Sequence, residues 1–180
     1  MKTIKVTIQG TSPLLMHSAQ GMVSPTATKN PTRQYDHDKE AEKVAYRNKK
    51  TKELYVPSRC LKACIINASS WFKFGKKSAK PIIAGSVFIE PFELGLGTKK
   101  YVVDLQPVVV QRQRIIRSRP RLDNWKLSFN LVYNEHLIGD TDLLKHIVEE
   151  AGQRVGLLDN RPHKSYGENG CFKIVSWGKK

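Results

Sequence analysis

Alternation of apolar and polar side chains is the feature that most limits how this chain can fold. In the first ten residues, Ile4, Val6 and Ile8 alternate with polar residues. A period of two is typical of a strand that buries one face of a sheet. Further extended segments are expected at 86–94, 101–110, 122–133 and 171–177. The sequence therefore predicts a sheet that is covered on one face.

Two helical segments separate these predicted strands. Pro57 and Ser58 suit a first helical turn. The apolar residues that follow are spaced to bury one helix face, namely Leu61, Ile65, Ala68 and Phe72. Asp140 is a suitable N-cap for a second helix, which is expected to end at Gly152. A shorter helix is expected over 38–46.

The order strand, helix, strands, helix, strand predicts an α+β fold of the ferredoxin-like (RRM-like) β-α-β-β-α-β type. In this fold two helices cover one face of an antiparallel sheet. Residues 1–180 fit a single nucleic-acid-binding domain with an extended basic hairpin. Residues 10–56 are expected to be an insertion after the first strand. Its first part, 10–35, is rich in Ser, Thr, Pro and Gly, so we expect it to be mobile.

The charge of the chain limits its function. Thirty-one Lys and Arg residues face sixteen Asp and Glu residues, which gives a net charge of +15 and a pI near 9.9. Such a surface attracts polyanions, of which nucleic acid is the commonest. No long apolar run predicts a membrane span, and the first residues lack the features of a secretory signal. Cys60, Cys64 and Cys171 lack CxxC spacing, so we expect no disulfide scaffold, no zinc site and a cytoplasmic location.

The densest basic segment is QRQRIIRSRPRL, residues 111–122. Its five arginines are Arg112, Arg114, Arg117, Arg119 and Arg121. Alternate residues of a hairpin share a face, so we expect the first two arginines to point together and the last three to do the same. Guanidinium groups match phosphate oxygens and stack on bases. Because Asp104 and Asp123 are the only acids nearby in the sequence, a nucleic-acid contact is favoured over a hairpin whose charges serve solubility alone.

A second basic segment, residues 71–80, combines lysines with aromatic residues. Lys73, Lys76 and Lys77 are candidates for contacts along a nucleic-acid backbone, and interleaved rings suit base stacking. Trp71 and Phe72 finish the predicted helix, however. We therefore expect these two rings to pack in the core.

The segment GQRVGLLDNRPHKSYGENGCFKIVSW, residues 152–177, joins the second helix to the last strand. Glycines allow backbone N–H groups to converge on an anion, and the candidates are Gly156, Gly167 and Gly170. Arg154, Arg161 and Lys164 would add positive charge, and Tyr166 a stacking surface. The alternative is that the glycines serve only turns.

No set of residues in the sequence predicts a catalyst. His17 is the candidate for a general base that would deprotonate a ribose 2′-hydroxyl. Asp36, His37 and Asp38 carry ligand atoms for a metal, but such a group in a polar loop is usually solvated. We therefore expect no metal, no cofactor and no catalytic residue.

Three stretches of the chain together resemble the RAMP superfamily, the RNA-binding backbone proteins of CRISPR effector complexes. They are IKVTIQGTSPLLMHS, LYVPSRCLKACIINAS and GQRVG…YGENGCFKIV, in that order. The resemblance covers roughly the whole chain and is weak between residues 86 and 139. It implies an RRM-like fold that binds one RNA strand, often as a repeating subunit of a filament, and it suits a solitary phage or prokaryotic relative.

On this resemblance, Ser58, Arg59 and Lys62 occupy the helix start that approaches RNA phosphates. The residues that match the family's glycine-rich loop are Gly156, Tyr166, Gly167 and Gly170. The chain departs from the family at Arg59 and Cys60, where small residues are usual. Some family members cut RNA with an aspartate in the loop before this helix, but no local motif identifies such a residue here.

The sequence therefore predicts non-catalytic binding of single-stranded nucleic acid, RNA in preference to DNA, with little sequence specificity. The expected partners are that strand and either further copies of the chain or subunits of a CRISPR-like complex for antiviral defence. Three alternatives stay open. They are a metal-independent endoribonuclease based on His17, a phage-borne protein that binds or mimics a CRISPR effector subunit, and a single-stranded DNA-binding protein.

Overall fold

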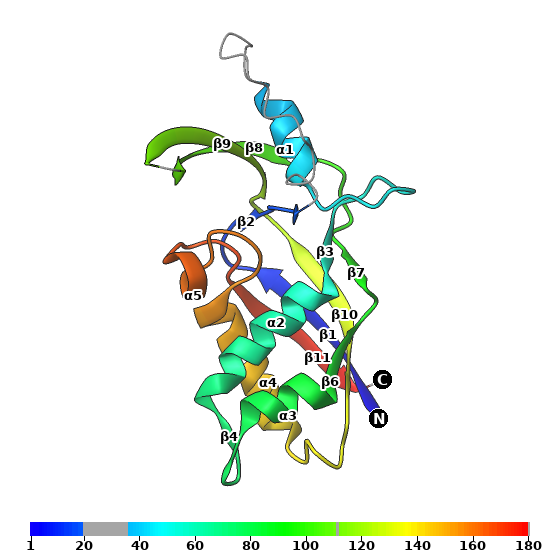
Figure 1. Ribbon diagram of the computed structural model, residues 1–180. Coiled ribbons are helices and arrows are strands. Elements are labelled where there is room, and N and C mark those ends of the chain that lie inside the picture. The colour runs from blue at the N-terminus through cyan, green and yellow to red at the C-terminus, as the bar shows by residue number, and fades with distance from the viewer. Residues whose placement is uncertain (20–35, 111, 180) are drawn as a thin grey trace.

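The computed structural model describes residues 1–19, 36–110 and 112–179. Its helices are α1 (His37–Val44), α2 (Ser58–Ala68), α3 (Ala79–Ser86), α4 (Thr141–Glu150) and α5 (Pro162–Ser165). Its strands are β1 (Lys2–Gly10), β2 (Leu14–Leu15), β3 (Tyr55–Pro57), β4 (Lys73–Phe74), β5 (Lys77–Ser78), β6 (Val87–Glu90), β7 (Glu93–Gly95), β8 (Val102–Val110), β9 (Gln113–Leu122), β10 (Lys126–Tyr133) and β11 (Phe172–Lys179). The fold combines helices with antiparallel sheets (Figure 1), which confirms the predicted α+β class.

The central sheet has the strand order β11-β1-β10-β6, and each neighbouring pair is antiparallel. In the register of β1 with β10, Ile4 lies opposite Leu131 and Ile8 lies opposite Leu127. Directly opposed residues point to the same face of a sheet. The alternating apolar side chains of both strands therefore gather on one face, where all four of these are buried.

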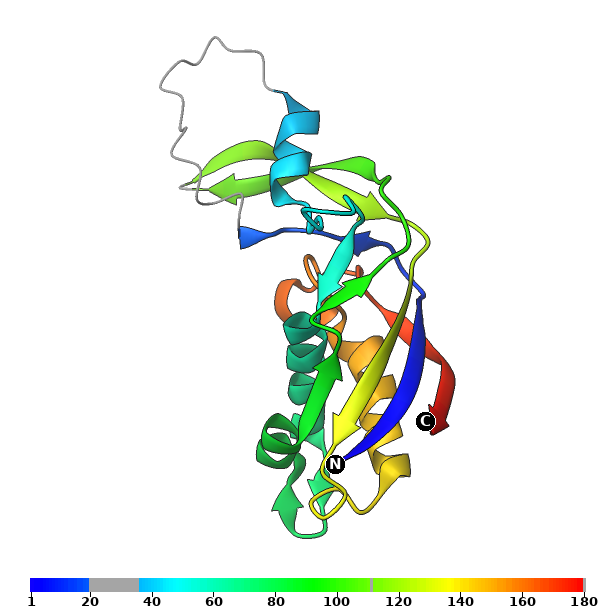
Figure 2. The ribbon, with the colours of Figure 1, turned by 90° about the vertical axis from the view of Figure 1, so that its right-hand side faces the viewer.

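Helices α2 and α4 cover this apolar face, and the other face of the sheet is uncovered (Figure 2). Leu61 and Ile65 of α2 and Ile147 of α4 are fully buried against it. The uncovered face is polar, and the hydroxyl groups of Thr7 and Ser128 lie 3.0 Å apart on it. The core therefore lies between the sheet and these two helices.

Strands β8 and β9 form a long hairpin beyond one end of the central sheet (Figure 1). Strand β2 pairs with β9, with Leu14 opposite Leu122. Helix α1 lies against the same strand, because the backbone N–H of Ser118 donates to the carboxylate of Glu40 at 2.8 Å and His37 Nδ1 lies 2.7 Å from Ser118 Oγ. Strand β2 and helix α1, which precede and follow residues 20–35, thus both contact the hairpin.

Glu42 connects α1 to the base of the hairpin. Its carboxylate accepts hydrogen bonds from Arg47 at 2.5 and 2.8 Å and from the Tyr101 hydroxyl at 2.9 Å. The hydrogen bond from Arg47 holds the pKa of Glu42 below its usual value. Burial, together with the hydrogen bond to Glu42, raises the pKa of Tyr101 to about 12. At the other end of α1, Asp36 caps the helix by accepting from the N–H of Lys39 at 3.0 Å.

Residues 10–19 pack into the fold, although the sequence suggested a mobile segment from residue 10. Leu14, Leu15 and Met16 are fully buried, and the Met16 N–H donates to the carbonyl of Pro120 at 3.0 Å. Their side chains fill the junction between the core and the hairpin. Residues 20–35, which hold most of the segment expected to be mobile, lie outside the described residues.

The predicted single strand over 86–94 is wrong. Ser86 ends α3, a helix that the sequence did not predict. Strands β6 and β7 follow, and they belong to different sheets, since β6 pairs with β10 and β7 with β3. Pro91 lies between them, and a proline has no N–H to continue a strand ladder.

The second helix does not end at Gly152, so the prediction of a cap there is wrong. Helix α4 continues as a π-helical turn, Ala151–Val155, and ends at Gly156, whose φ of 75° is left-handed. A Cβ atom on Gly152 would lie 2.1 Å from the backbone oxygen of Phe172. Glycine is therefore needed at 152 because β11 passes too close to the helix for any side chain.

Candidate nucleic-acid interface

The N-terminus of α2 has no side chain that caps it and no acidic residue in its first turn. Pro57 is the N-cap residue, and it has no side-chain acceptor to offer. The Ser58 N–H donates to the carbonyl of Phe92 at 2.8 Å, while its side chain is buried. The amides that follow carry the partial positive charge of a helix N-terminus, which favours an anion.

Two tyrosines and an arginine lie beside this helix start. The rings of Tyr46 and Tyr55 have centroids 5.9 Å apart and are tilted by 59°. Burial raises the pKa of the Tyr46 hydroxyl, and the nearby positive charge of Arg59 opposes that shift. Arg59 itself is exposed. Sequence analysis missed both tyrosines, although Tyr55 directly precedes the buried Val-Pro that leads into the helix.

Arg161 reaches the same place from the other end of the sequence. A Cβ atom on Gly156, whose carbonyl accepts from the Cys64 thiol of α2, would lie 3.1 Å from the Cβ atom of Arg161. Burial raises the pKa of the Cys60 thiol, and the charges of Arg59 and Arg161 both oppose that shift. The Arg161 Nη1 donates to the carbonyl of Leu158 at 2.8 Å, whereas its buried Nε has no hydrogen-bond partner among the described residues. The structure thus brings together two of the predicted cations.

Cys64 connects α2 to the turn that begins the glycine-rich loop, residues 156–170. Its thiol donates to the carbonyls of Ala151 at 3.3 Å and Gly156 at 3.2 Å. Burial raises the pKa of this thiol far above its usual range, so it remains protonated and able to donate. The buried hydrogen bonds of Cys64 therefore hold the start of the loop against α2.

The glycines of the loop serve close backbone packing more than an anion-binding nest. The Gly156 N–H donates to Ala151, and the Gly170 N–H donates to the carbonyl of Pro13 at 2.8 Å. A Cβ atom on Gly167 would lie 2.1 Å from the oxygen of Asn160, and one on Gly170 would lie 2.0 Å from that of Leu157. Two of the three predicted amides are thus occupied within the protein. A ligand would therefore contact this loop mainly through its side chains.

Two of these side chains are exposed to solvent. Helix α5 places Lys164 on the surface, and Tyr166 follows in the left-handed region with φ of 53°. Tyr166 is 98% exposed. An exposed ring beside a lysine is suited to stacking on a base whose phosphate is neutralised nearby.

Three of the five hairpin arginines are ion-paired within the fold. The pairs are Arg117–Glu40 at 3.0 Å, Arg119–Asp159 at 2.8 Å, and Arg121 with Asp104 at 2.9 Å and with Asp123 at 2.8 Å. Residues 117, 119 and 121 share one face of β9, as the alternation predicts. Asp104 and Asp123 are the only acids nearby in the sequence, but Glu40 and Asp159 approach the hairpin from distant segments.

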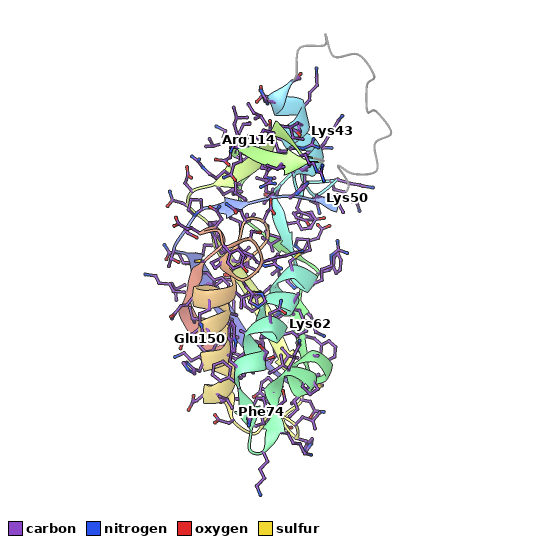
Figure 3. The ribbon with its side chains drawn as sticks, turned by 60° about the vertical axis from the view of Figure 1, so that its left-hand side comes forward. Lys43, Lys50, Lys62, Phe74, Arg114 and Glu150 are labelled. Atoms are coloured by element: carbon purple, nitrogen blue, oxygen red, sulfur yellow. The ribbon has the colours of Figure 1, made fainter. Side chains whose placement is uncertain are left out.

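The other two hairpin arginines are exposed. Arg112 lies in the turn with φ of 67°, so strand alternation does not extend to it. Arg114 lies opposite Val109 on the face away from the paired arginines. Figure 3 shows Arg114 at the end of the molecule that also holds Lys43 of α1. Neither arginine has an ion pair within the described residues.

Asp159 joins the hairpin to the glycine-rich loop. Its backbone N–H donates to the carbonyl of Leu15 at 3.2 Å, and its carboxylate pairs with Arg119, which is 13% exposed. His17 Nδ1 lies 3.8 Å from the same carboxylate oxygen, which is longer than a hydrogen bond. Strand β9, the segment after β2 and the loop therefore meet at one carboxylate.

The lysines of the second basic segment lie elsewhere. Lys73, Lys76 and Lys77 belong to the small β4–β5 hairpin that follows α2. This hairpin lies at the opposite end of the molecule from β8–β9, and Figure 3 shows Phe74 there. Lys62 lies on the side of α2 toward edge strand β6, with its Nζ 4.4 Å from the ring centroid of Phe88. The three lysines of the β4–β5 hairpin therefore lie far from the start of α2, whereas Lys62 is one helical turn from Arg59.

Two of the residues that carry ligand atoms for a metal make structural contacts. Asp36 caps α1, and His37 contacts Ser118. Within residues 1–19, 36–110 and 112–179, no group of three or more His, Cys, Asp or Glu side chains is arranged to hold a metal ion. Among the helices of this described part, none is long and apolar enough to cross a membrane.

Comparison with known proteins supports the fold. The sequence matches no protein-family model and no curated protein. The structure is similar to a chain in the "Cryo-EM structure of the Type III-B Cmr-beta bound to cognate target RNA", with a TM-score of 0.58 and 12% sequence identity. The likeness covers 99% of this chain and 61% of that chain, so this chain spans about three fifths of its length. The two chains share a fold.

Proposed function

We propose that this protein binds a single strand of nucleic acid, RNA in preference to DNA, without cutting it. The strand would pass the N-terminus of α2 and the glycine-rich loop and continue toward the tip of the β8–β9 hairpin. The cations that would contact its phosphates are Arg59, Arg112, Arg114, Arg161 and Lys164. The rings of Tyr46, Tyr55 and Tyr166 would contact its bases.

The uncapped N-terminus of α2, which carries Arg59 and lies near the loop that carries Arg161, is the observation that carries this proposal. The two residues come from opposite ends of the sequence, and both affect the pKa of Cys60. No acid lies in the first turn of the helix to neutralise them. Two guanidinium groups and a helix dipole that converge on one place favour an anion with several oxygens, such as a phosphate.

The topology supports a place in the RAMP superfamily. We infer a ferredoxin-like core, with β8–β9 as an insertion, from the order β1-α2-β6-β10-α4-β11 and the central position of β1 and β10. The similar chain comes from a complex bound to RNA. We infer that this protein acts in the cytoplasm as a subunit that assembles along RNA, with further copies of itself or with other subunits of a CRISPR-like complex.

Fluorescence anisotropy with labelled oligonucleotides tests the proposal. We expect binding in the order single-stranded RNA, single-stranded DNA, duplex RNA, from tightest to weakest. Arg59→Gln and Arg161→Gln should each weaken binding, whereas Lys126→Gln should not, because Lys126 at the start of β10 lies on the uncovered face of the sheet, opposite the face covered by α2. Equal losses in all three variants would indicate attraction to net charge alone and would overturn the proposed interface.

The same samples distinguish binding from cleavage. His17 lies near Asp159, and a histidine beside a carboxylate is the arrangement of a general base. We expect RNA to remain intact when it is incubated with the protein in EDTA. Cleavage that is lost in His17→Ala would establish the metal-independent endoribonuclease instead.

A further inference from the structure

Trp71 lies on the surface, although the sequence suggested that it packs in the core. It ends the 3-10 turn Ser69–Trp71 that follows α2, and 43% of its surface is exposed. Trp125, by contrast, is 5% exposed and its indole N–H donates to the carbonyl of Ser12 at 2.8 Å. Exposing so large an apolar ring has a free-energy cost in water. An exposed tryptophan therefore calls for an explanation other than core packing.

The surroundings of Trp71 are cationic. The guanidinium carbon of Arg154 lies 4.3 Å from the centroid of the Trp71 ring, within the range of a cation–π contact. Arg154 also donates to the carboxylate of Glu150 at 3.3 Å, which orients the guanidinium over the ring. Glu150 lies on α4, as Figure 3 shows. The ring is thus held by α4 while much of its surface stays open.

Trp71 also contacts the glycine-rich loop. The His163 ring meets it edge-on, with centroids 6.1 Å apart and an interplanar angle of 74°. His163 belongs to α5 and directly precedes Lys164, one of the cations of the proposed interface. The tryptophan therefore lies next to that interface, on the side away from the β8–β9 hairpin.

We propose that Trp71 is a stacking site for one unpaired base of the bound strand, with Arg154 as the residue that positions the ring. This inference rests on the proposed function and adds a base contact at a residue not included in the interface above. A partly exposed planar ring can stack on any base, and a guanidinium beside it strengthens the contact.

Tryptophan fluorescence tests the stacking site directly, because a stacked base quenches indole emission. We expect oligo(U) to quench the emission of the wild-type protein and to lose most of this quenching in Trp71→Phe. Trp177→Phe is the matched control, since Trp177 packs against the core, and it should keep the quenching. An abasic oligomer of the same length should bind without quenching.

Affinity gives the second readout. Trp71→Ala should weaken binding of oligo(U) by roughly 5- to 150-fold, the loss expected for one base–aromatic stack, with little effect on the abasic oligomer. Trp71→Phe should restore most of the affinity, which a variant that merely fails to fold would not do. Equal losses for both oligomers, or quenching that persists in Trp71→Phe, would overturn the stacking site while the proposed function stands. Absence of binding by the wild-type protein to either oligomer would overturn both.

Discussion

The salt dependence of binding tests which cations are available to a nucleic acid. Three hairpin arginines are ion-paired, which leaves five cations in the proposed interface, namely Arg59, Arg112, Arg114, Arg161 and Lys164. Five phosphate contacts with a single strand predict a slope of log K against log salt of about −3.5. Affinity should then fall about 130-fold between about 50 and 200 mM salt. If the three paired arginines also contributed, the slope would be about −5.6 and the loss about 2,000-fold.

Two variants separate the available cations from the paired ones. Arg59→Gln removes one phosphate contact and should reduce the magnitude of the slope by about 0.7. Arg121→Gln removes the same charge but should leave the slope unchanged, because Asp104 and Asp123 already neutralise Arg121. Anisotropy titrations at a series of salt concentrations measure both slopes, and circular dichroism checks that each variant is folded.

A wild-type slope near about −5.6 would refute this reasoning, since all eight contacts would then be needed to account for it. An equal reduction of the slope by the two variants would refute it as well. Either result would mean that the ion pairs open when the strand binds and that the hairpin arginines turn toward it.

Three further predictions concern the fold that supports the interface. Gly152→Ala should lower the free energy of unfolding by about 1–3 kcal/mol or more, because the added methyl group meets the backbone of β11. Gly85→Ala on α3 should not lower it, because no atom lies within 4 Å of the added methyl group. Urea titrations of the two variants measure the difference. Asp159→Asn should lower the free energy of unfolding by about 1–3 kcal/mol, because its arginine partner on β9 is left without a counter-charge. A thermal midpoint equal to that of the wild-type protein would contradict this role of the carboxylate. Glu42 has a folded-state pKa below its ordinary value of about 4.3, so its ion pair contributes stability above that value and loses it as the pH falls through the lower pKa. Stability curves at acidic pH should therefore be flatter for Glu42→Gln, and parallel curves would exclude this contribution.

Much of the fold could be predicted from the sequence because the signals are local. Alternation identified β1 and β10, and the Pro57–Ser58 start with its apolar spacing identified α2. Helix α3 was missed because Pro81 falls in its first turn, where a proline is tolerated but hides the pattern. The sequence could not show that Gly152 continues the helix, since its role depends on how closely β11 approaches.

The candidate site could be predicted only in part, because it depends on contacts between distant segments. The resemblance identified Arg59, the charge of the terminal loop suggested Arg161, and in the structure both charges act on the Cys60 thiol. The charge of the hairpin was overestimated, since Glu40 pairs with an arginine 77 residues away and Asp159 approaches through the segment after β2. The only indication in the sequence that Tyr46 and Tyr55 belong to the site was their position close to the start of a helix. Pairing of charges across a fold is not visible in local composition.

The carboxylate of Asp159 has a consequence for the length of nucleic acid that one protein covers. Because β9, the loop and the segment after β2 all meet there, we expect the cations at the hairpin tip to keep a constant separation from those at the start of α2. A strand that spans both sets must supply the same number of nucleotides each time. We therefore expect the length of nucleic acid protected from nuclease to rise in equal steps as copies of the protein are added. Asp159→Asn should make the protected lengths less uniform while binding itself remains.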